Sequence, residues 1–392
     1  MSRLVSRLDG FSETIFATMT NLAVSRGAIN VGQGFPDEDG PQSMLDEACR
    51  QIAAGNNQYS PGRGEMILRQ AVATDRGLST GMEVDPESQV LITVGATEAI
   101  TATVLALVEP GREIIVVEPY YDAYAAAAAL AGARLVPVAL ELDDDGFHLD
   151  PAALAAAVTR DTAMIIINTP HNPTGIVLEE QQLKAIADIA IAHDLLVLVD
   201  EVYEKLVYDG RRHLPLAAID GMAGRTITVS SAAKCLNVTG WKTGWAIGQP
   251  DVIDAVAKAK QFLTFVGCTP VQPAVAHALL NEREWMARLC ASMQSRRDQL
   301  SAALVQAGFR VYPTGGGYFI VADAAPLGVD DAAHFVTTTL IDHGIAAIPV
   351  SPFASSGNRH RFDSLVRFAF CKKEQTIAEA AAVLSRLNLA GG

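Results

Sequence analysis

Seven short apolar runs, each separated from the next by a helix-like stretch, constrain the fold of this chain most. Two of them, MIIIN and LLVLVD, do not alternate between apolar and polar residues, so both faces of those strands should be buried. Such strands alternating with helices are typical of an α/β fold with a mostly parallel, doubly wound sheet. The runs are Val90–Val94, Glu113–Glu118, Arg134–Leu140, Ala163–Asn168, Leu195–Asp200, Thr226–Ser230 and Trp245–Ile247.

The length of 392 residues allows two domains, each with its own core. A largely helical stretch, 250–307, leads into a C-terminal part with short strands on either side of a turn at 314–317. A helix at 331–343, strands at 346–350 and 365–370, and a closing helix at 374–387 follow. We therefore predict a large domain over 41–288 and a small α+β domain formed by 1–40 and 289–392.

Composition excludes several classes of function. The net charge of −14 disfavours nucleic acid and anionic membrane as partners. The alanine-rich run 123–133 is too short to span a bilayer. Five cysteines without a C-x-x-C pair favour a reducing cytoplasm, and the eight histidines show no metal-ligand spacing, so we predict no metal. No G-x-G-x-x-G follows a strand, which argues against a Rossmann dehydrogenase.

One lysine, at the end of a predicted strand, is a candidate catalytic residue. Lys234 lies in the small-residue run SSAAK, directly after the apolar strand 226–229. A lysine at the end of a buried strand readily loses its proton, which suits it to Schiff-base chemistry. Ser231 and Lys242 are placed to reach an anion such as a phosphate beside it. The alternative for any single lysine is a solvated surface group.

Other polar residues follow predicted strands, and each has a plain structural alternative. Asp200 ends LLVLVD, at the edge where an α/β sheet presents catalytic groups, but it also suits a helix N-cap. Asn172 in NTPHNPTG also suits a simple turn. Ala96 and Thr97 begin a helix after the strand VLITV, which forms either an anion site or an ordinary cap at Thr97. Arg367 in LVRFAF needs an anionic partner if buried, or lies on an edge strand in solvent.

These residues and their spacing resemble a known family. Ser-x-x-Lys followed by Thr-Gly-Trp-Lys-x-Gly-Trp resembles the lysine segment of the fold-type I pyridoxal-phosphate (PLP) aminotransferases. Asn172 lies 28 positions before Asp200, while Tyr203 lies three and Lys234 lies 34 positions after it, as in class I/II members. VGQGFPDEDGP, VGATEAI, NTPHNPTG, DEVYEKLVYDG and AAIPVSPF are similar to the kynurenine, glutamine and methionine aminotransferase branch.

The segments SSAAK and VGCTPVQPAV bring the resemblance nearest to actinobacterial N-succinyldiaminopimelate aminotransferases. Ala233 departs from the glycine or serine that many relatives have before the lysine, which removes one possible hydroxyl contact to the phosphate. The resemblance covers essentially the whole chain. It implies a PLP-transferase fold type I with a seven-stranded sheet, a homodimer with shared active sites, and a cytoplasmic enzyme.

The resemblance also implies a role for each cofactor-binding residue. Lys234 attaches PLP and serves as the base, Asp200 faces the pyridine nitrogen, and Tyr203 helps in catalysis. A carboxylate about 4 Å from that nitrogen stabilises its proton by roughly 4 kcal/mol at an effective dielectric of 20. The other residues expected to contact the ring, its phenolic oxygen or the phosphate are Ala96, Thr97, Tyr121, Asn172, Tyr203, Ser231 and Lys242, with Tyr59 from the neighbouring subunit.

For the substrate, the resemblance implies that Arg367 binds the α-carboxylate bidentately and that the backbone amide of Gly34 assists it. Asn172, Phe16 and Tyr59 are expected to line the substrate pocket, together with Ile15 and Phe265. The bonds Glu118–Pro119 and Asn172–Pro173 are expected to be cis, as hypotheses.

The implied activity is ping-pong transfer of an α-amino group from an L-amino acid to a 2-oxo acid, with 2-oxoglutarate and glutamate as one pair. The donor is expected to be N-succinyl-LL-2,6-diaminopimelate, in lysine biosynthesis. A broad kynurenine-, glutamine- or methionine-type aminotransferase and a PLP-dependent carbon–sulfur β-lyase remain open alternatives. A regulator built on an aminotransferase-like domain would need an appended basic helix-turn-helix, for which the chain has neither length nor charge.

Overall fold

A computed structural model describes residues 5–11 and 15–387 of the chain. Its centre is a seven-stranded sheet in the order β2-β10-β9-β8-β7-β3-β4. All neighbours are parallel except β10, which runs antiparallel to both β2 and β9. The prediction of a mostly parallel sheet is therefore confirmed. The strands are β2 (Val90–Val94), β3 (Glu113–Glu118), β4 (Arg134–Ala139), β7 (Thr162–Asn168), β8 (Leu196–Asp200), β9 (Thr226–Ser231) and β10 (Thr243–Ile247).

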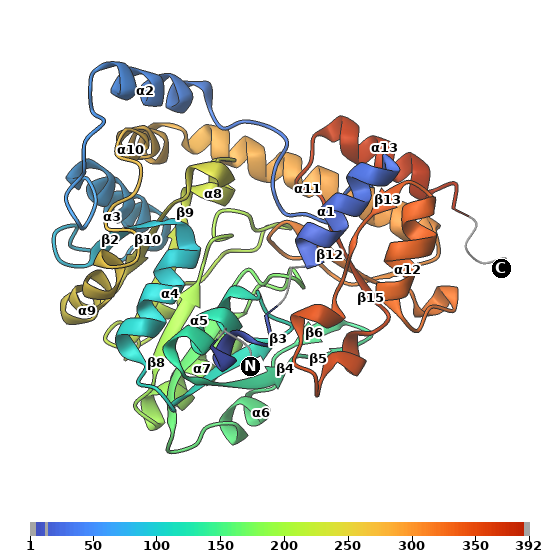
Figure 1. Ribbon diagram of the computed structural model, residues 1–392, viewed down its shortest axis with the longest axis horizontal. Helices are drawn as coiled ribbons and strands as arrows, with labels where there is room; N and C mark the ends of the chain where they lie inside the picture. The colour runs from blue at the N-terminus through green and yellow to red at the C-terminus, as the bar shows by residue number, and fades with distance from the viewer. Residues whose placement is uncertain (1–4, 12–14, 388–392) are drawn as a thin grey trace.

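The central strands bury both faces, as their unbroken apolar runs predict. In β3, Ile114 and Val116 belong to one core and Ile115 belongs to another on the opposite face. Met164 and Ile165 of β7 divide in the same way. Helices therefore cover the sheet on both sides (Figure 1). Those packed on it or beside it are α2 (Gln42–Ala53), α3 (Met66–Thr80), α4 (Gly95–Leu107), α5 (Ala123–Ala131), α6 (Pro151–Ala156), α7 (Glu180–Ala192), α8 (Ala232–Cys235), α9 (Pro250–Gln261) and α10 (Val271–Asn281).

A second, four-stranded antiparallel sheet has the order β11-β12-β15-β14 and lies on the right in Figure 1. The long helix α11 (Arg283–Gln306) crosses toward it from the large sheet, so the predicted boundary at 288 falls inside a helix and the domain division stays a prediction. The strands of this part are β11 (Arg310–Val311), β12 (Phe319–Asp323), β14 (Ile348–Pro349) and β15 (Leu365–Ala369). Its helices are α1 (Ile15–Arg26), α12 (Ala332–Phe335) and α13 (Glu374–Leu384).

Two small pairings complete the fold. Strand β1 (Ile29–Asn30) pairs in parallel with β13 (Ile345–Ala346), which joins the N-terminal segment to the C-terminal part. Strands β5 (Glu141–Asp143) and β6 (Gly146–His148) form a hairpin.

The helix expected at 331–343 departs from prediction in its middle, where residues Val336–Leu340 form a π turn. The hydroxyl of Thr337 donates to the Ala333 carbonyl at 2.8 Å, and that of Thr338 donates to the His334 carbonyl at 2.7 Å. These side chains compete for carbonyls that regular helical hydrogen bonds use, which favours a wider turn.

The close approach of helix α4 to the large sheet depends on one glycine. Gly244 of β10 is buried, and a Cβ placed there would lie 2.6 Å from the backbone carbon of Gly95 and 2.8 Å from the nitrogen of Ala96. These atoms begin helix α4. The absent side chain therefore allows the N-terminus of α4 to approach the sheet closely.

We predict that Gly244→Ala lowers the free energy of unfolding by about 1–3 kcal/mol, because the new methyl group meets backbone atoms that cannot move aside. Gly240→Ala is the matched control, since a Cβ there meets no atom within 4 Å. Thermal unfolding of the two variants tests this. Equal melting temperatures would contradict the packing described for Gly244.

Candidate active site

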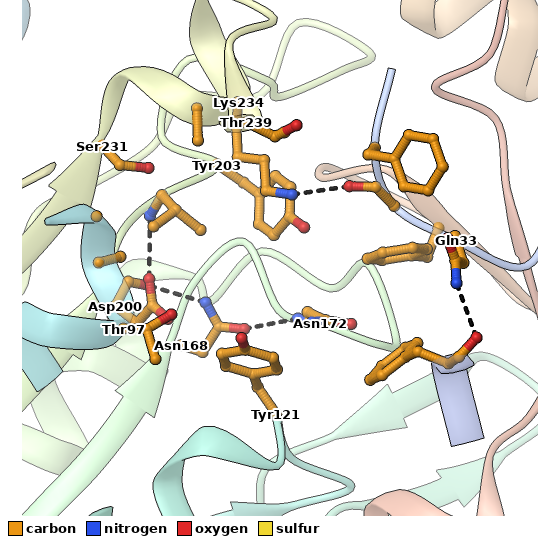
Figure 2. Close-up of a pocket in the computed structure, with 18 of the residues that line it drawn as sticks. Gln33, Thr97, Tyr121, Asn168, Asn172, Asp200, Tyr203, Ser231, Lys234 and Thr239 are labelled. Carbon is orange, nitrogen blue, oxygen red and sulfur yellow. Dashed lines mark hydrogen bonds between the residues drawn. The ribbon is translucent and has the colours of Figure 1, made fainter. Parts of the chain in front are cut away.

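A cavity of about 360 Å³ lies where the ends of β7, β8 and β9 meet the N-terminus of α4 and residues of the C-terminal part. It gathers nearly all of the residues singled out from the sequence (Figure 2). Those lining it are Phe16, Gly34, Ala96, Thr97, Tyr121, Asn172, Asp200, Tyr203, Ser231, Lys234, Lys242 and Arg367. Tyr59, Ile15 and Phe265 are not among the lining residues.

Asp200 presents its carboxylate at the C-terminal end of β8 and is buried. The Tyr124 hydroxyl donates to its Oδ2 at 2.8 Å, and the Val202 amide donates to its Oδ1 at 3.3 Å. Burial raises the pKa of Asp200 to about 6, although the Tyr124 hydrogen bond and the more distant Lys234 work in the opposite direction. The carboxylate thus lies in a place that favours a cationic partner.

Lys234 follows β9 on the short helix α8, and its ammonium group points into the cavity. Its Nζ donates to the Gly34 carbonyl oxygen at 2.8 Å and lies 5.2 Å from the Tyr318 ring centre and 5.7 Å from that of Tyr203. Removal from bulk water lowers the pKa of Lys234 to about 8. A substantial fraction of this amine is therefore unprotonated slightly above neutral pH.

Arg367 lies in β15, between β12 and β14, with 1% of its surface exposed. Its Nη1 donates to Asn172 Oδ1 at 3.0 Å and its Nη2 donates to the Gly32 carbonyl at 2.8 Å, while its buried Nε has no partner among the described residues. Its Cζ lies 3.9 Å from the Phe319 ring centre. The alternative of a solvated arginine on an edge strand is therefore wrong.

Burial lowers the pKa of Arg367 to about 10 against the smaller opposing effect of nearby groups such as Asp122, and no carboxylate among the described residues forms an ion pair with it. A guanidinium in this position lacks an anionic partner. The protein has thus placed a desolvated cation, with one nitrogen unsatisfied, against the cavity wall.

The opposite end of the cavity is built to receive an anion. Gly95 has φ of +74° and begins α4, so the amides that follow it, at Ala96 and Thr97, lie at a helix N-terminus. Ser231 ends β9 beside them, and the Lys242 Nζ approaches Gly95. The hydroxyl of Thr97 does not cap α4; instead Glu98 Oε2 accepts from the Val94 amide at 2.6 Å.

An asparagine that the sequence analysis did not single out connects two of these residues. Asn168, at the end of β7, donates from Nδ2 to the Asp200 carbonyl at 2.8 Å and accepts from the Asn172 amide at 2.6 Å (Figure 2). It therefore fixes the loop that carries Asn172 against the end of β8. Its position at the end of the buried run MIIIN could have identified it from the sequence.

Tyr124 was also missed; it lies in the first turn of α5, and its amide donates to the carbonyl of Tyr121, which precedes that helix, at 3.0 Å. The two rings are 5.8 Å apart in an edge-to-face arrangement. Complete burial and the nearby Asp200 raise the pKa of Tyr124 well above its usual value, which keeps the hydroxyl protonated as a donor.

Tyr59 lies on the surface of this chain with 81% exposure, and its ring packs edge-to-face on Phe265 at 5.3 Å. Phe265 is itself exposed. The expectation that Ile15 and Phe265 line the substrate pocket is therefore not met within the single chain. A part for Tyr59 in a neighbouring subunit's cavity stays a prediction.

Both proline bonds that were expected to be cis, Glu118–Pro119 and Asn172–Pro173, are cis, as is Thr169–Pro170. Among the described residues, no helix has both the length and the apolar character needed to cross a membrane.

A second buried polar cluster lies near the site. Glu201, Glu204 and His213 approach one another closely enough to hold a metal ion. Arg76 already lies between the two carboxylates, with Nη1 at 2.5 Å from Glu201 and 3.0 Å from Glu204. Its guanidinium occupies the position that a cation would take, and it holds the pKa of Glu201 at about 2 against the effect of burial.

The sequence and the fold are similar to those of known proteins. A family model for aminotransferase class I and II matches residues 26–384. A probable N-succinyldiaminopimelate aminotransferase of Mycobacterium tuberculosis is 52% identical over 98% of both chains. The methionine aminotransferase of Escherichia coli K12 is 36% identical over 97% of this chain and 98% of its own. The solved structure of N-succinyldiaminopimelate aminotransferase from M. tuberculosis superposes with a TM-score of 0.96 at 53% identity, covering 98% of this chain and 100% of that one.

We predict that Asp200→Asn stabilises the cofactor-free protein by roughly 1–3 kcal/mol at pH 8. The folded-state pKa of about 6 lies above the unfolded value near 3.8, so the folded protein holds its proton more tightly and ionisation costs stability above pH 6. The advantage of asparagine should shrink as the pH falls from 6 toward 4.

Thermal unfolding of both cofactor-free proteins at pH 8 and pH 5 provides the measurement. The Tyr124 hydroxyl can donate to or accept from an amide, so the substitution leaves it satisfied. A wild-type protein more stable than the variant at pH 8 would contradict the desolvation assigned to Asp200.

Proposed function

We propose a cofactor and a substrate from one premise: the chain belongs to the aminotransferase class I and II family and is an aminotransferase. The cofactor is pyridoxal 5'-phosphate, and the reaction moves the α-amino group of an L-amino acid to a 2-oxo acid, with 2-oxoglutarate and glutamate as one pair. One observation carries this proposal. Lys234, Asp200 and Arg367 come from three distant parts of the chain and line one cavity.

The chemistry of the cavity fits this cofactor. Its lining holds three cations, Lys234, Lys242 and Arg367, but only one carboxylate, Asp200. None of the three cations forms an ion pair with a carboxylate of the described residues. A phosphate and a substrate carboxylate would supply the missing negative charge, and a protonated pyridine nitrogen would supply the cation that buried Asp200 lacks.

Each residue has a proposed place around that group. The amides of Ala96 and Thr97, the Ser231 hydroxyl and Lys242 would hold the phosphate, while Tyr121 would pack on the ring. Tyr203 and Asn172 would donate to the phenolic oxygen; the Tyr203 hydroxyl and the Asn172 Nδ2 have no hydrogen-bond partner among the described residues. When bound, the cofactor joins Lys234 and supplies an electron-withdrawing ring that acidifies the α-hydrogen of an amino acid.

The residues then divide the work. Arg367 orients the substrate through its α-carboxylate, with Nε available to it, and the Gly34 segment borders the same space. The Lys234 amine, whose pKa is lowered to about 8, would take the α-proton of the amino acid and would give it up again as the amino group is transferred. Asp200 keeps the ring nitrogen protonated, and Tyr203 remains a proton donor because burial raises its pKa well above 10.

The proposed assembly is a cytoplasmic homodimer in which Tyr59 of one subunit reaches the phosphate in the other. Tyr59, Phe262 and Phe265 are exposed aromatic side chains, with Tyr59 and Phe262 more than 80% exposed. Such a group of exposed aromatics is typical of a protein interface. The described cysteines are all unpaired, which suits a reducing compartment.

N-succinyl-LL-2,6-diaminopimelate is the proposed amino donor, on the strength of the 52% identical relative that shares the full length of the chain. Kynurenine–oxoglutarate transaminase 3 of rat, 35% identical over 97% of this chain, supports a broader aminotransferase as the second candidate. A panel of amino donors with 2-oxoglutarate decides between them by kcat/KM. Release of pyruvate and ammonia without a 2-oxo acid acceptor would indicate a β-lyase instead.

Lys234→Ala is expected to reduce turnover by at least ten-thousandfold, because it removes both the attachment point and the base. Lys242→Ala is the contrasting variant: it should weaken PLP binding about tenfold yet retain turnover at saturating PLP. Initial rates with N-succinyl-LL-2,6-diaminopimelate as the donor and 2-oxoglutarate as the acceptor, over a range of PLP concentrations, provide the test. Comparable residual rates in the two variants would remove Lys234 from its proposed role.

Arg367→Lys should raise the KM for L-glutamate by roughly 10–100-fold, because a lysine loses the bidentate contact worth about 1.5–3 kcal/mol. The cofactor spectrum and the affinity for PLP should stay unchanged, since Arg367 lies at the substrate end of the cavity. An unchanged KM would reassign this arginine to a purely structural role.

A further inference from the structure

A buried glutamate outside the cavity holds together the two parts of the chain that form it. Glu118 is the last residue of β3, with none of its surface exposed. The amide of Ser355 donates to its Oε1, and Asn358 donates from Nδ2 to its Oε2 at 2.6 Å. Among the described residues, no cation forms an ion pair with it. Its partners are therefore two neutral N–H groups from a segment more than 230 positions away.

The two donors explain why this position needs a carboxylate. An ionised carboxylate accepts hydrogen bonds at both oxygens, whereas a glutamine accepts at one and presents an NH₂ group at the other. Glutamine here keeps both contacts only when the Asn358 amide flips to accept from it, and it then replaces two charge-assisted hydrogen bonds with weaker neutral ones. The free energy spent on desolvating Glu118 is thus offset by two contacts that join β3 to the segment 353–358.

That segment begins with a residue in contact with the substrate-binding arginine. Phe353 is buried, and its ring centre lies 5.0 Å from the Arg367 Cζ and 5.6 Å from the ring centre of Phe16. The amide of Tyr120, two residues after Glu118, donates to the Phe353 carbonyl at 2.8 Å. The end of β3 therefore forms hydrogen bonds with both ends of segment 353–358, at Phe353 and at Asn358.

The orientation of the Arg367 guanidinium depends on this packing. Its two hydrogen bonds go to Asn172 and Gly32, and its Nε is unsatisfied, so the aromatic rings of Phe319 and Phe353 beside it also restrict the plane of the guanidinium. A shift of the Phe353 ring would let that plane rotate. Bidentate binding of a carboxylate tolerates little rotation.

We propose that Glu118 is a positioning residue for substrate affinity: by fastening segment 353–358 to the end of β3, it holds Phe353 against Arg367 and fixes the guanidinium plane for a carboxylate. This inference rests on the proposed role of Arg367. It predicts that loss of the two hydrogen bonds between Glu118 and segment 353–358 (the Glu118 latch) weakens the binding of carboxylates and leaves the proton-transfer residues in place.

The test is Glu118→Gln in the PLP-loaded enzyme. The KM for L-glutamate and the dissociation constant for glutarate, an unreactive dicarboxylate measured by calorimetry, should both rise about 5–30-fold. The kcat should stay within about twofold and PLP affinity should be unchanged. Asn358→Ala, at a half-buried position, provides a milder second variant with a smaller shift in the same direction, in case Glu118→Gln folds poorly.

Glu113 at the other end of β3 offers a matched control. It is also buried, and it accepts from the hydroxyl groups of Thr159 and Thr162 and pairs with Arg134 at 2.6 Å, all remote from the cavity. Glu113→Gln should lower the melting temperature without changing the KM or the glutarate affinity. If Glu118→Gln behaves in the same way as Glu113→Gln, Glu118 has only a structural role and the proposal is overturned.

Rescue provides a readout that general destabilisation does not produce. In Glu118→Gln combined with Asn358→Asp, the glutamine donates to the new carboxylate and still accepts from the Ser355 amide, so glutarate affinity should recover most of its loss. Phe353→Leu combined with Glu118→Gln should weaken glutarate binding no more than Phe353→Leu alone, because both act through one contact. Additive losses, or no recovery in the rescue variant, would refute the latch.

The Arg367→Lys variant separates the two levels of inference. If it leaves glutarate affinity unchanged, the proposed role of Arg367 fails and the proposal for Glu118 fails with it. If Arg367→Lys weakens glutarate binding while Glu118→Gln does not, only the positioning role is refuted.

Discussion

An imbalance of charge in one small cavity is the constraint on which the functional part of this structure depends. Three cations and one carboxylate line about 360 Å³, and none of the cations has a carboxylate partner among the described residues. Desolvation raises the pKa of Asp200 and lowers the pKa values of Lys234 and Arg367. Ligands that supply the opposite charges would stabilise such an arrangement.

The fold creates this imbalance through the geometry of its strand ends. Parallel neighbours β7 and β8 end side by side, so Asn168 and Asp200 meet although 32 positions separate them. Strand β9 delivers Ser231 and, one short helix later, Lys234 to the same edge. The second sheet contributes Arg367 from β15, and Gly34 lines the same cavity and accepts from Lys234. Several of the polar groups are thus fixed where the buried strands stop, on rigid elements of the fold.

Much of this was predictable from the sequence, for identifiable reasons. Unbroken apolar runs determine a doubly buried parallel sheet, and residues that follow such runs must gather at one edge. Their places at strand ends made Asp200, Asn172 and Lys234 candidates, and a burial argument did so for Arg367; the resemblance to the aminotransferases then favoured these roles over the plain structural alternatives. Tyr124 carried a weaker signal because its sequence neighbours are alanines, and its partner Asp200 is 76 positions away.

The remainder could not be predicted because it depends on contacts between distant segments. Nothing near Glu118 in the sequence indicates Ser355 or Asn358 as partners, and an acid ending an apolar strand looks like a solvated surface group. The π turn at 336–340 depends on which carbonyls the threonine hydroxyls choose, which residue type alone does not determine. The position of Tyr59 relative to a cavity depends on a second subunit, and a single sequence does not define that surface.

The central claim is that Lys234 holds an aldehyde cofactor within this cavity, and reduction of the purified protein with borohydride tests it most directly. After incubation with pyridoxal 5'-phosphate, reduction and digestion, mass spectrometry should find one phosphopyridoxyl group, on the peptide that contains Lys234, in near-stoichiometric amount. An unmodified Lys234 peptide, or label spread over several surface lysines, would contradict it.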